Sequence, residues 1–210
     1  MFDLGPALEH ATVAPGTNLL VSGPPLSGKR RVAIEVLAVG SQEGEGAIVV
    51  TTRDDARQVL RHFRSQSDDL ARGPVEIVDC VTKQQGRPTA ESPNVAYVDS
   101  PDDMTAIGIQ FSELLEEFAV ERGIDRTRVT LDSLTTLLMY SDAETVFQFL
   151  HVFTDRIDNA GALGLFLIES RAHDPEIRNT LSQLFDGIIT TTPDDTPTLD
   201  LSPSDEDVNS

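Results

Sequence analysis

Short apolar runs alternate with segments of helical periodicity along most of this 210-residue sequence, and that alternation limits the folds open to it. The apolar runs predicted as strands are residues 17–22, 46–51, 75–81, 95–98, 129–132, 164–168 and 188–191. The helical segments predicted between them are residues 29–39, 56–63, 104–118, 146–157 and 175–185. Strands separated by helices favour a mainly parallel sheet with helices on both faces. With right-handed crossovers, the pattern predicts a three-layer α/β/α domain whose ligands bind beyond the carboxyl ends of the strands.

The periodic part of the chain predicts a single domain at residues 14–192, preceded by an N-terminal segment at residues 1–13. Residues 193–210 form an acidic tail without periodicity, and its last part, residues 202–210, is expected to be disordered. The polar, turn-rich segment at residues 82–94 predicts a mobile loop.

Acidic residues dominate the composition, with 35 Asp and Glu against 16 Lys and Arg and a net charge of -19. Lysine occurs only at Lys29 and Lys83. This composition is typical of proteins from a molar-salt cytoplasm. At that salt concentration the Debye length falls to about 3 Å, and surface charges scarcely repel one another. Asp3 and Glu9 exclude a basic leader, and no apolar run is long enough to span a membrane. We therefore expect a soluble, cytoplasmic protein without a membrane partner.

The turn after the first predicted strand matches the pattern G-x-x-x-x-G-K. The residues predicted there to bind a nucleotide are Gly23, Pro24, Pro25, Leu26, Ser27, Gly28, Lys29 and Arg30. Glycines let backbone N–H groups point at a phosphate, and the helix that follows adds the positive end of its dipole. Lys29 can reach the β- and γ-phosphates as a point charge. The alternative interpretation is a tight glycine turn with an incidental lysine.

Arg30 departs from this pattern, because the position directly after the lysine normally holds a Ser or Thr whose hydroxyl binds Mg²⁺. Arginine cannot coordinate a metal ion and adds its own positive charge. Either Arg30 replaces the charge of the metal and makes nucleotide binding metal-independent, or it points into solvent and Asp132 holds Mg²⁺ through water. The sequence leaves both arrangements open.

Asp132 ends the predicted strand at residues 129–132, downstream of the glycine-rich turn. An apolar strand that delivers an Asp to a metal-bound water beside the phosphates is the Walker B arrangement. An Asp at a strand end also serves often as a helix cap or turn residue. Together with the upstream glycine-rich turn, Asp132 is the predicted metal ligand.

With these motifs on hand, the chain resembles the RecA superfamily, and more narrowly the small, single-domain haloarchaeal members of the KaiC/RAD55-like ATPases. The segments that carry the resemblance are residues 15–23, the glycine-rich turn, and residues 48–51, 132–135, 166–169 and 185–189. The resemblance spans about residues 14–192. It implies a RecA-like P-loop fold, ATP as the ligand and assembly into a homo-oligomer.

Three parts of the family's machinery are altered here: the metal-binding hydroxyl, which Arg30 replaces, the general base and the cations that act on a neighbouring subunit. Active members place a catalytic glutamate just after the second strand, where this chain has Arg53 and Asp54, so Asp54 would be a shorter general base. Members also carry basic residues on C-terminal strands, whereas no Lys or Arg follows Arg178. The resemblance further places a γ-phosphate sensor at Glu169, which is otherwise a polar residue at a strand end. Loss of a general base costs typically about 10²–10⁴-fold and loss of an arginine finger about 10³–10⁵-fold.

The sequence therefore predicts an ATP-binding regulatory protein with weak or no hydrolysis, acting on a protein partner that the sequence does not identify. One alternative is a pseudo-ATPase that binds no nucleotide and serves as a protein-interaction module. A recombination-type ATPase paralogue that binds single-stranded DNA is a weaker alternative, because such sites need aromatic stacking platforms and aromatic residues make up only 5% of this chain.

Overall fold

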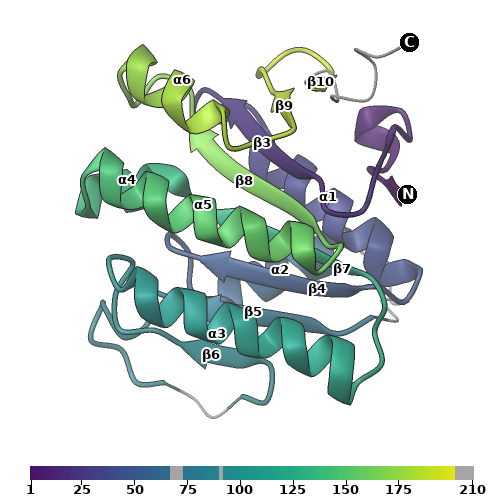
Figure 1. Cartoon of the computed structure of the whole chain (residues 1–210), viewed down its shortest axis with the longest axis vertical. Helices are drawn as coiled ribbons and strands as arrows, with labels where there is room; N and C mark the ends of the chain where they lie inside the picture. The colour runs from purple at the N-terminus through teal and green to yellow at the C-terminus, as the bar shows by residue number, and fades with distance from the viewer. Residues whose placement is uncertain (67–72, 90–91, 202–210) are drawn as a thin grey trace.

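The computed structural model describes residues 1–66, 73–89 and 92–201, and it has three layers, with a sheet between two sets of helices (Figure 1). The sheet has eight strands in the order β10-β9-β3-β8-β7-β4-β5-β6. These strands are β3 (Asn18–Gly23), β4 (Gly46–Thr51), β5 (Val75–Asp79), β6 (Val95–Tyr97), β7 (Thr127–Asp132), β8 (Leu163–Glu169), β9 (Gly187–Thr190) and β10 (Thr198–Leu201). Neighbouring strands pair in parallel, except for antiparallel β10 at one edge. The predicted α/β/α domain with a mainly parallel sheet is confirmed.

Two helices cover one face of the sheet and the others cover the opposite face (Figure 1). The first pair is α1 (Lys29–Gln42) and α2 (Ala56–Gln66). The opposite layer consists of α3 (Met104–Glu116) with its π-helical continuation η2 (Glu117–Glu121), α4 (Leu134–Tyr140), α5 (Ala143–Asn159) and α6 (Pro175–Ser182). None of these described helices is both long and apolar enough to cross a bilayer.

Successive side chains along each strand point to opposite faces of the sheet, so the core has a part on each face. Leu19 and Val21 of β3 pack with α1, whereas Leu20 between them packs into the core beneath α3, α4 and α5. On that second face, Phe111 and Phe153 stack with ring centroids 4.0 Å apart. Because both faces are buried, the strands read as continuous apolar runs, which is the signal that made them predictable.

The N-terminal segment packs against α1. Its elements are β1 (Phe2–Asp3), the short helix η1 (Pro6–Leu8) and β2 (Thr12–Val13), and β1 pairs with β2 in an antiparallel hairpin. Phe2 and Leu4 are fully buried and share a cluster with Val32 and Val36 of α1. Residues 1–13 therefore complete the core on this face of the sheet.

The sequence pattern did not indicate the short elements of residues 1–13, nor α4 and β10. Helix α4 follows directly after β7, with the Ser133 side chain as its cap, accepting a hydrogen bond from the backbone N–H of Thr136. Strand β10 lies in the segment expected to be an acidic tail, and it pairs with β9. The expected disorder at residues 202–210 and part of the 82–94 loop fall outside the described residues.

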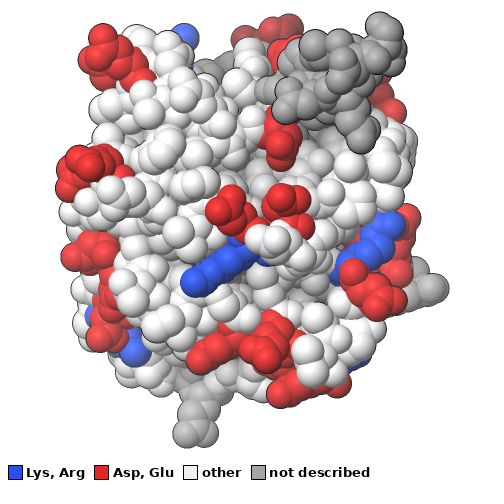
Figure 2. Space-filling view, in the orientation of Figure 1, with Lys and Arg blue, Asp and Glu red and all other residues white. Residues whose placement is uncertain are grey.

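Acidic side chains are spread over the face of the molecule that Figure 2 shows, and basic ones are few there. This distribution agrees with the net charge of -19. A group of cations paired with carboxylates lies at the carboxyl ends of the central strands, where the glycine-rich loop is found.

Candidate nucleotide-binding site

The glycine-rich loop, residues 23–30, connects β3 to the first turn of α1. Gly28 has a φ of +84° at the N-cap of α1, a conformation that favours glycine. A Cβ atom at Gly23 would lie 2.1 Å from the hydroxyl oxygen of Thr191 and 2.4 Å from that of Ser27. The hydroxyls of Ser27 and Thr191 are themselves hydrogen-bonded at 2.7 Å, so the loop is tied to the end of β9. The structure thus explains why glycine occupies both positions of the motif: a side chain would clash at Gly23, and the backbone of Gly28 has a positive φ.

The first turn of α1 combines unpaired backbone donors with positively charged side chains. The first four N–H groups of a helix have no acceptor inside it, and the positive end of the helix dipole lies there. Acidic side chains usually stabilise this end, but the first turn of α1 contains none and begins with Lys29 and Arg30. Cations at a helix N-terminus are unfavourable unless negative charge lies opposite them.

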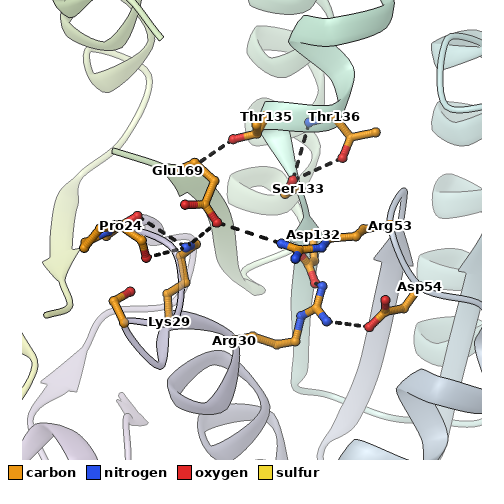
Figure 3. A network of polar contacts seen from close by, with 12 residues as sticks. Pro24, Lys29, Arg30, Arg53, Asp54, Asp132, Ser133, Thr135, Thr136 and Glu169 are labelled. Carbon is orange, nitrogen blue, oxygen red and sulfur yellow. Dashed lines mark hydrogen bonds and ion pairs between the residues drawn. The ribbon is translucent and has the colours of Figure 1, made fainter. Parts of the chain in front are cut away.

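Lys29 is held inside the site by three oxygens (Figure 3). Its Nζ donates to the carbonyl oxygens of Pro24 at 3.0 Å and Gly23 at 3.3 Å. It also lies 2.6 Å from Oε1 of Glu169, and the side chains of both residues are largely buried. The ammonium group that was predicted to hold phosphates is therefore paired with a carboxylate of the same chain.

Glu169, the predicted γ-phosphate sensor, is the last residue of β8 and lines the same groove as the glycine-rich loop. Its backbone N–H donates to the hydroxyl of Thr135 at 2.9 Å, which fixes the end of the strand to α4. Arg53 reaches the same carboxylate at 3.8 Å. The second oxygen of this carboxylate is buried without a hydrogen-bond donor in the described part of the chain.

Arg30 points into the site and not into solvent. Its guanidinium lies between two carboxylates, since Nη1 bonds to Oδ2 of Asp54 and Nη2 lies 2.6 Å from Oδ2 of Asp132. The arrangement in which Arg30 points away and leaves Asp132 free is not observed. Burial raises the pKa of the Asp132 carboxyl, and the neighbouring guanidinium acts in the opposite direction.

Backbone contacts place Asp132 at the end of β7. The N–H of Thr52 donates to the Asp132 carbonyl at 2.8 Å, and the hydroxyl of Thr52 accepts from the Ser133 N–H at 2.8 Å. The peptide bond between Asp132 and Ser133 is cis. The ends of β4 and β7 are thus tied together, which puts Asp54, just after β4, within reach of the same arginine as Asp132.

An open groove of about 370 Å³ lies over these groups. It is lined by residues 25–30 of the loop together with Arg53, Asp132, Leu167 and Glu169. The charged groups of the network balance, three cations against three carboxylates: Lys29, Arg30 and Arg53 with Asp54, Asp132 and Glu169. No cluster of three or more His, Cys, Asp or Glu side chains suited to a metal ion occurs in the described residues.

The structure brings together all the residues that the sequence predicted for this site, and it adds others. The added residues are threonines whose hydroxyls hold parts of the site in place. The hydroxyl of Thr191 supports the loop, that of Thr135 supports Glu169, and that of Thr52 supports the end of β7 at Asp132. Arg53 also contacts Glu169, whereas the sequence indicated only that it occupies the position of the family's catalytic glutamate. A signal for the threonines exists in the sequence, because each of them follows a strand of the parallel sheet within three residues and so lies at the same edge.

The fold is that of a RecA-like α/β/α domain, with a glycine-rich loop between β3 and α1. A KaiC-like protein from the hyperthermophilic archaeon Pyrococcus horikoshii OT3 has a similar structure, with a TM-score of 0.59 and 16% sequence identity over 88% of this chain and 74% of that one. A model of a family of unknown function, DUF7504, matches residues 16–191, and the chain belongs to that family. A search of curated proteins finds no match.

Proposed function

We propose that the protein is an ATP-binding regulatory protein of the KaiC/RAD55-like type, with weak or no ATP hydrolysis. The observation that carries the proposal is the first turn of α1, where Lys29 and Arg30 follow a glycine-rich loop and no acidic residue is present. Free N–H groups, a helix dipole and a lysine at one point form a phosphate site.

Weak hydrolysis follows from the state of Asp54. A general base must be free to accept a proton from the attacking water, but the Asp54 carboxylate is bonded to Arg30. Among the described residues after β9, none is basic, so the chain supplies no cation from there to a neighbouring subunit's nucleotide. An ATP site without turnover can act only through a change of conformation or of partner affinity. This supports a regulatory role, with a protein partner or a second copy of the chain as its target, in a molar-salt cytoplasm.

The direct test is calorimetric titration of the protein with ATP in molar KCl, followed by a single-turnover assay of phosphate release. We expect saturable heat of binding and little or no inorganic phosphate. Absence of heat both with and without Mg²⁺ would remove the proposal. Rapid phosphate release would leave ATP binding in place but refute the assignment as a weak or inactive ATPase.

A second candidate is a protein-interaction module that binds no nucleotide. The ion pair between Lys29 and Glu169 favours it, because the lysine is already neutralised inside the chain. A thermal melt distinguishes the two candidates. ATP raises the melting temperature if it binds the folded state, and leaves it unchanged if the domain is only an interaction module.

A further inference from the structure

A magnesium ion does not fit the residues where a P-loop site normally holds it. Two protein groups usually face the metal, namely the hydroxyl directly after the loop lysine and the aspartate that ends the Walker B strand. Here the first position is Arg30, and its guanidinium pairs with the aspartate in the second position, Asp132. The chain thus brings its own cation to the carboxylate that a metal would use.

This arginine cannot make room for a metal by losing its charge, because a guanidinium stays protonated in proteins. It could leave only by breaking its contacts with both Asp54 and Asp132. Those contacts come from two different strand ends, β4 and β7, which adjoin in the sheet. A divalent ion beside Asp132 would also lie within a few ångströms of a like charge, which disfavours it.

One nitrogen of the Arg30 guanidinium makes no hydrogen bond in the described part of the chain. Nη2 lies 2.6 Å from the Asp132 carboxylate, yet the contact lacks hydrogen-bond geometry, and this buried nitrogen has no acceptor among the described residues. Arg30 lines the same groove as Lys29. A phosphate oxygen in the groove is an acceptor of the kind that a guanidinium fork binds.

We propose that Arg30 takes the place of the metal ion, so that the site binds the phosphates of a nucleoside di- or triphosphate without Mg²⁺. The proposal rests on the proposed function and specifies its ligand as the metal-free nucleotide. Lys29 and the first turn of α1 hold the phosphates from one side, and Arg30 supplies the positive charge that Mg²⁺ supplies elsewhere.

The next residue offers a matched control. Arg31 is exposed, and no ion pair is found for it in residues 1–66, 73–89 and 92–201. Arg30→Ser restores a hydroxyl at the position that follows the lysine and frees Asp132, whereas Arg31→Ser removes the same charge from the solvent face of the helix. Comparison of the two variants separates the role of Arg30 from a general loss of positive charge.

The experiment is titration with ATP and with ADP in molar KCl, in EDTA or in excess Mg²⁺. For the wild-type protein and for Arg31→Ser, we expect dissociation constants that agree within about twofold between the two buffers. For Arg30→Ser, we expect binding to become about tenfold or more tighter in Mg²⁺ than in EDTA, the size of effect that completing a metal site produces.

Wild-type binding that weakens about tenfold or more in EDTA would overturn the proposal and leave ATP binding intact. Arg30→Ser that binds equally well in both buffers would also overturn it. Absence of wild-type binding in either buffer would refute the proposed function together with this inference. The wild-type comparison needs no variant, so it decides the matter even if Arg30→Ser does not fold.

Discussion

Strand β7 carries one member of each of two arginine–carboxylate networks that lie at opposite ends of the sheet. At its amino end, Arg128 is fully buried and donates to Glu45 at 2.5 Å and to the carbonyl oxygens of Asp3 and Val36 at 2.6 and 2.7 Å. At its carboxyl end, Asp132 faces Arg30, whose side chain is 27% exposed. The pair of Arg128 and Glu45 is closed to solvent, whereas the network at Arg30 opens into a groove.

The same kind of ion pair supports the fold in one place and, under the proposed function, is available to a ligand in the other. Arg128 lies 5.4 Å from the ring centroid of Phe2 and joins the N-terminal hairpin to α1, so it cannot move without exposing the core. Under the proposed function, the pairs at the loop exchange their carboxylates for phosphate oxygens, and we expect the fold to stay intact. Burial, and not the identity of the charged groups, separates the two networks.

The largest effect that this comparison predicts is on stability. Arg128→Met removes the cation from a buried pair and leaves Glu45 with Arg126 only, so we expect the free energy of unfolding to fall by about 3–5 kcal/mol. Urea denaturation in molar KCl measures it. Arg30→Ser is the comparison variant, with a smaller expected loss, because the groove lets water reach the Asp132 carboxylate that loses its partner. Equal losses in the two variants would contradict the distinction.

The next effect concerns the affinity for ATP. Lys29→Ala removes a charged donor to the phosphates, and a hydrogen bond of that kind contributes about 1.5–3 kcal/mol, or about 10–100-fold in the dissociation constant. Calorimetric titration measures it. Lys83, the other lysine, pairs with Asp99 on the surface at 2.8 Å, so Lys83→Ala should bind ATP as the wild-type protein does. A similar loss in both variants would argue for non-specific attraction between ATP and positive charge.

A smaller effect is expected when the internal competitor is weakened. Glu169→Gln keeps the shape of the side chain but removes the negative charge that lies 2.6 Å from Lys29. Phosphates would then no longer have to displace a carboxylate, and we expect ATP to bind about threefold to tenfold more tightly.

The control for that variant is Glu113→Gln, on the exposed side of α3, where Glu113 accepts a hydrogen bond from Gln110. It should leave the affinity unchanged. Weaker binding in Glu169→Gln would mean that the carboxylate assists the ligand instead of competing with it, as a sensor of the γ-phosphate would.

The sequence predicted those parts of the fold and the site that depend on the backbone. Continuous apolar runs marked the buried strands, and the spacing from Gly23 to Lys29 located the loop between β3 and α1. Asp132 was predictable because the ends of parallel strands meet at one edge of the sheet. Strand β10 was not, because its side chains are mostly exposed and its pairing with β9 depends on backbone hydrogen bonds.

The sequence did not predict the directions of the side chains within the site. Spacing placed Arg30 directly after Lys29 but left open whether it faces the phosphates or the solvent, because both directions are possible in the first turn of a helix. The choice depends on Asp54 and Asp132, which follow different strands and meet only in the folded sheet. The pairing of Lys29 with Glu169 depends in the same way on the contact between β3 and β8.

Because lysine is scarce in this chain, the opening of the Lys29–Glu169 pair can be followed with an amine-specific reagent. The chain has two lysines, with side-chain exposures of 9% for Lys29 and 41% for Lys83. Apart from the α-amino group, a reagent specific for amines meets one accessible target, Lys83, as long as Glu169 holds Lys29. Labelling at Lys29 therefore reports directly on the opening of that ion pair, and mass spectrometry of a single peptide suffices to follow it.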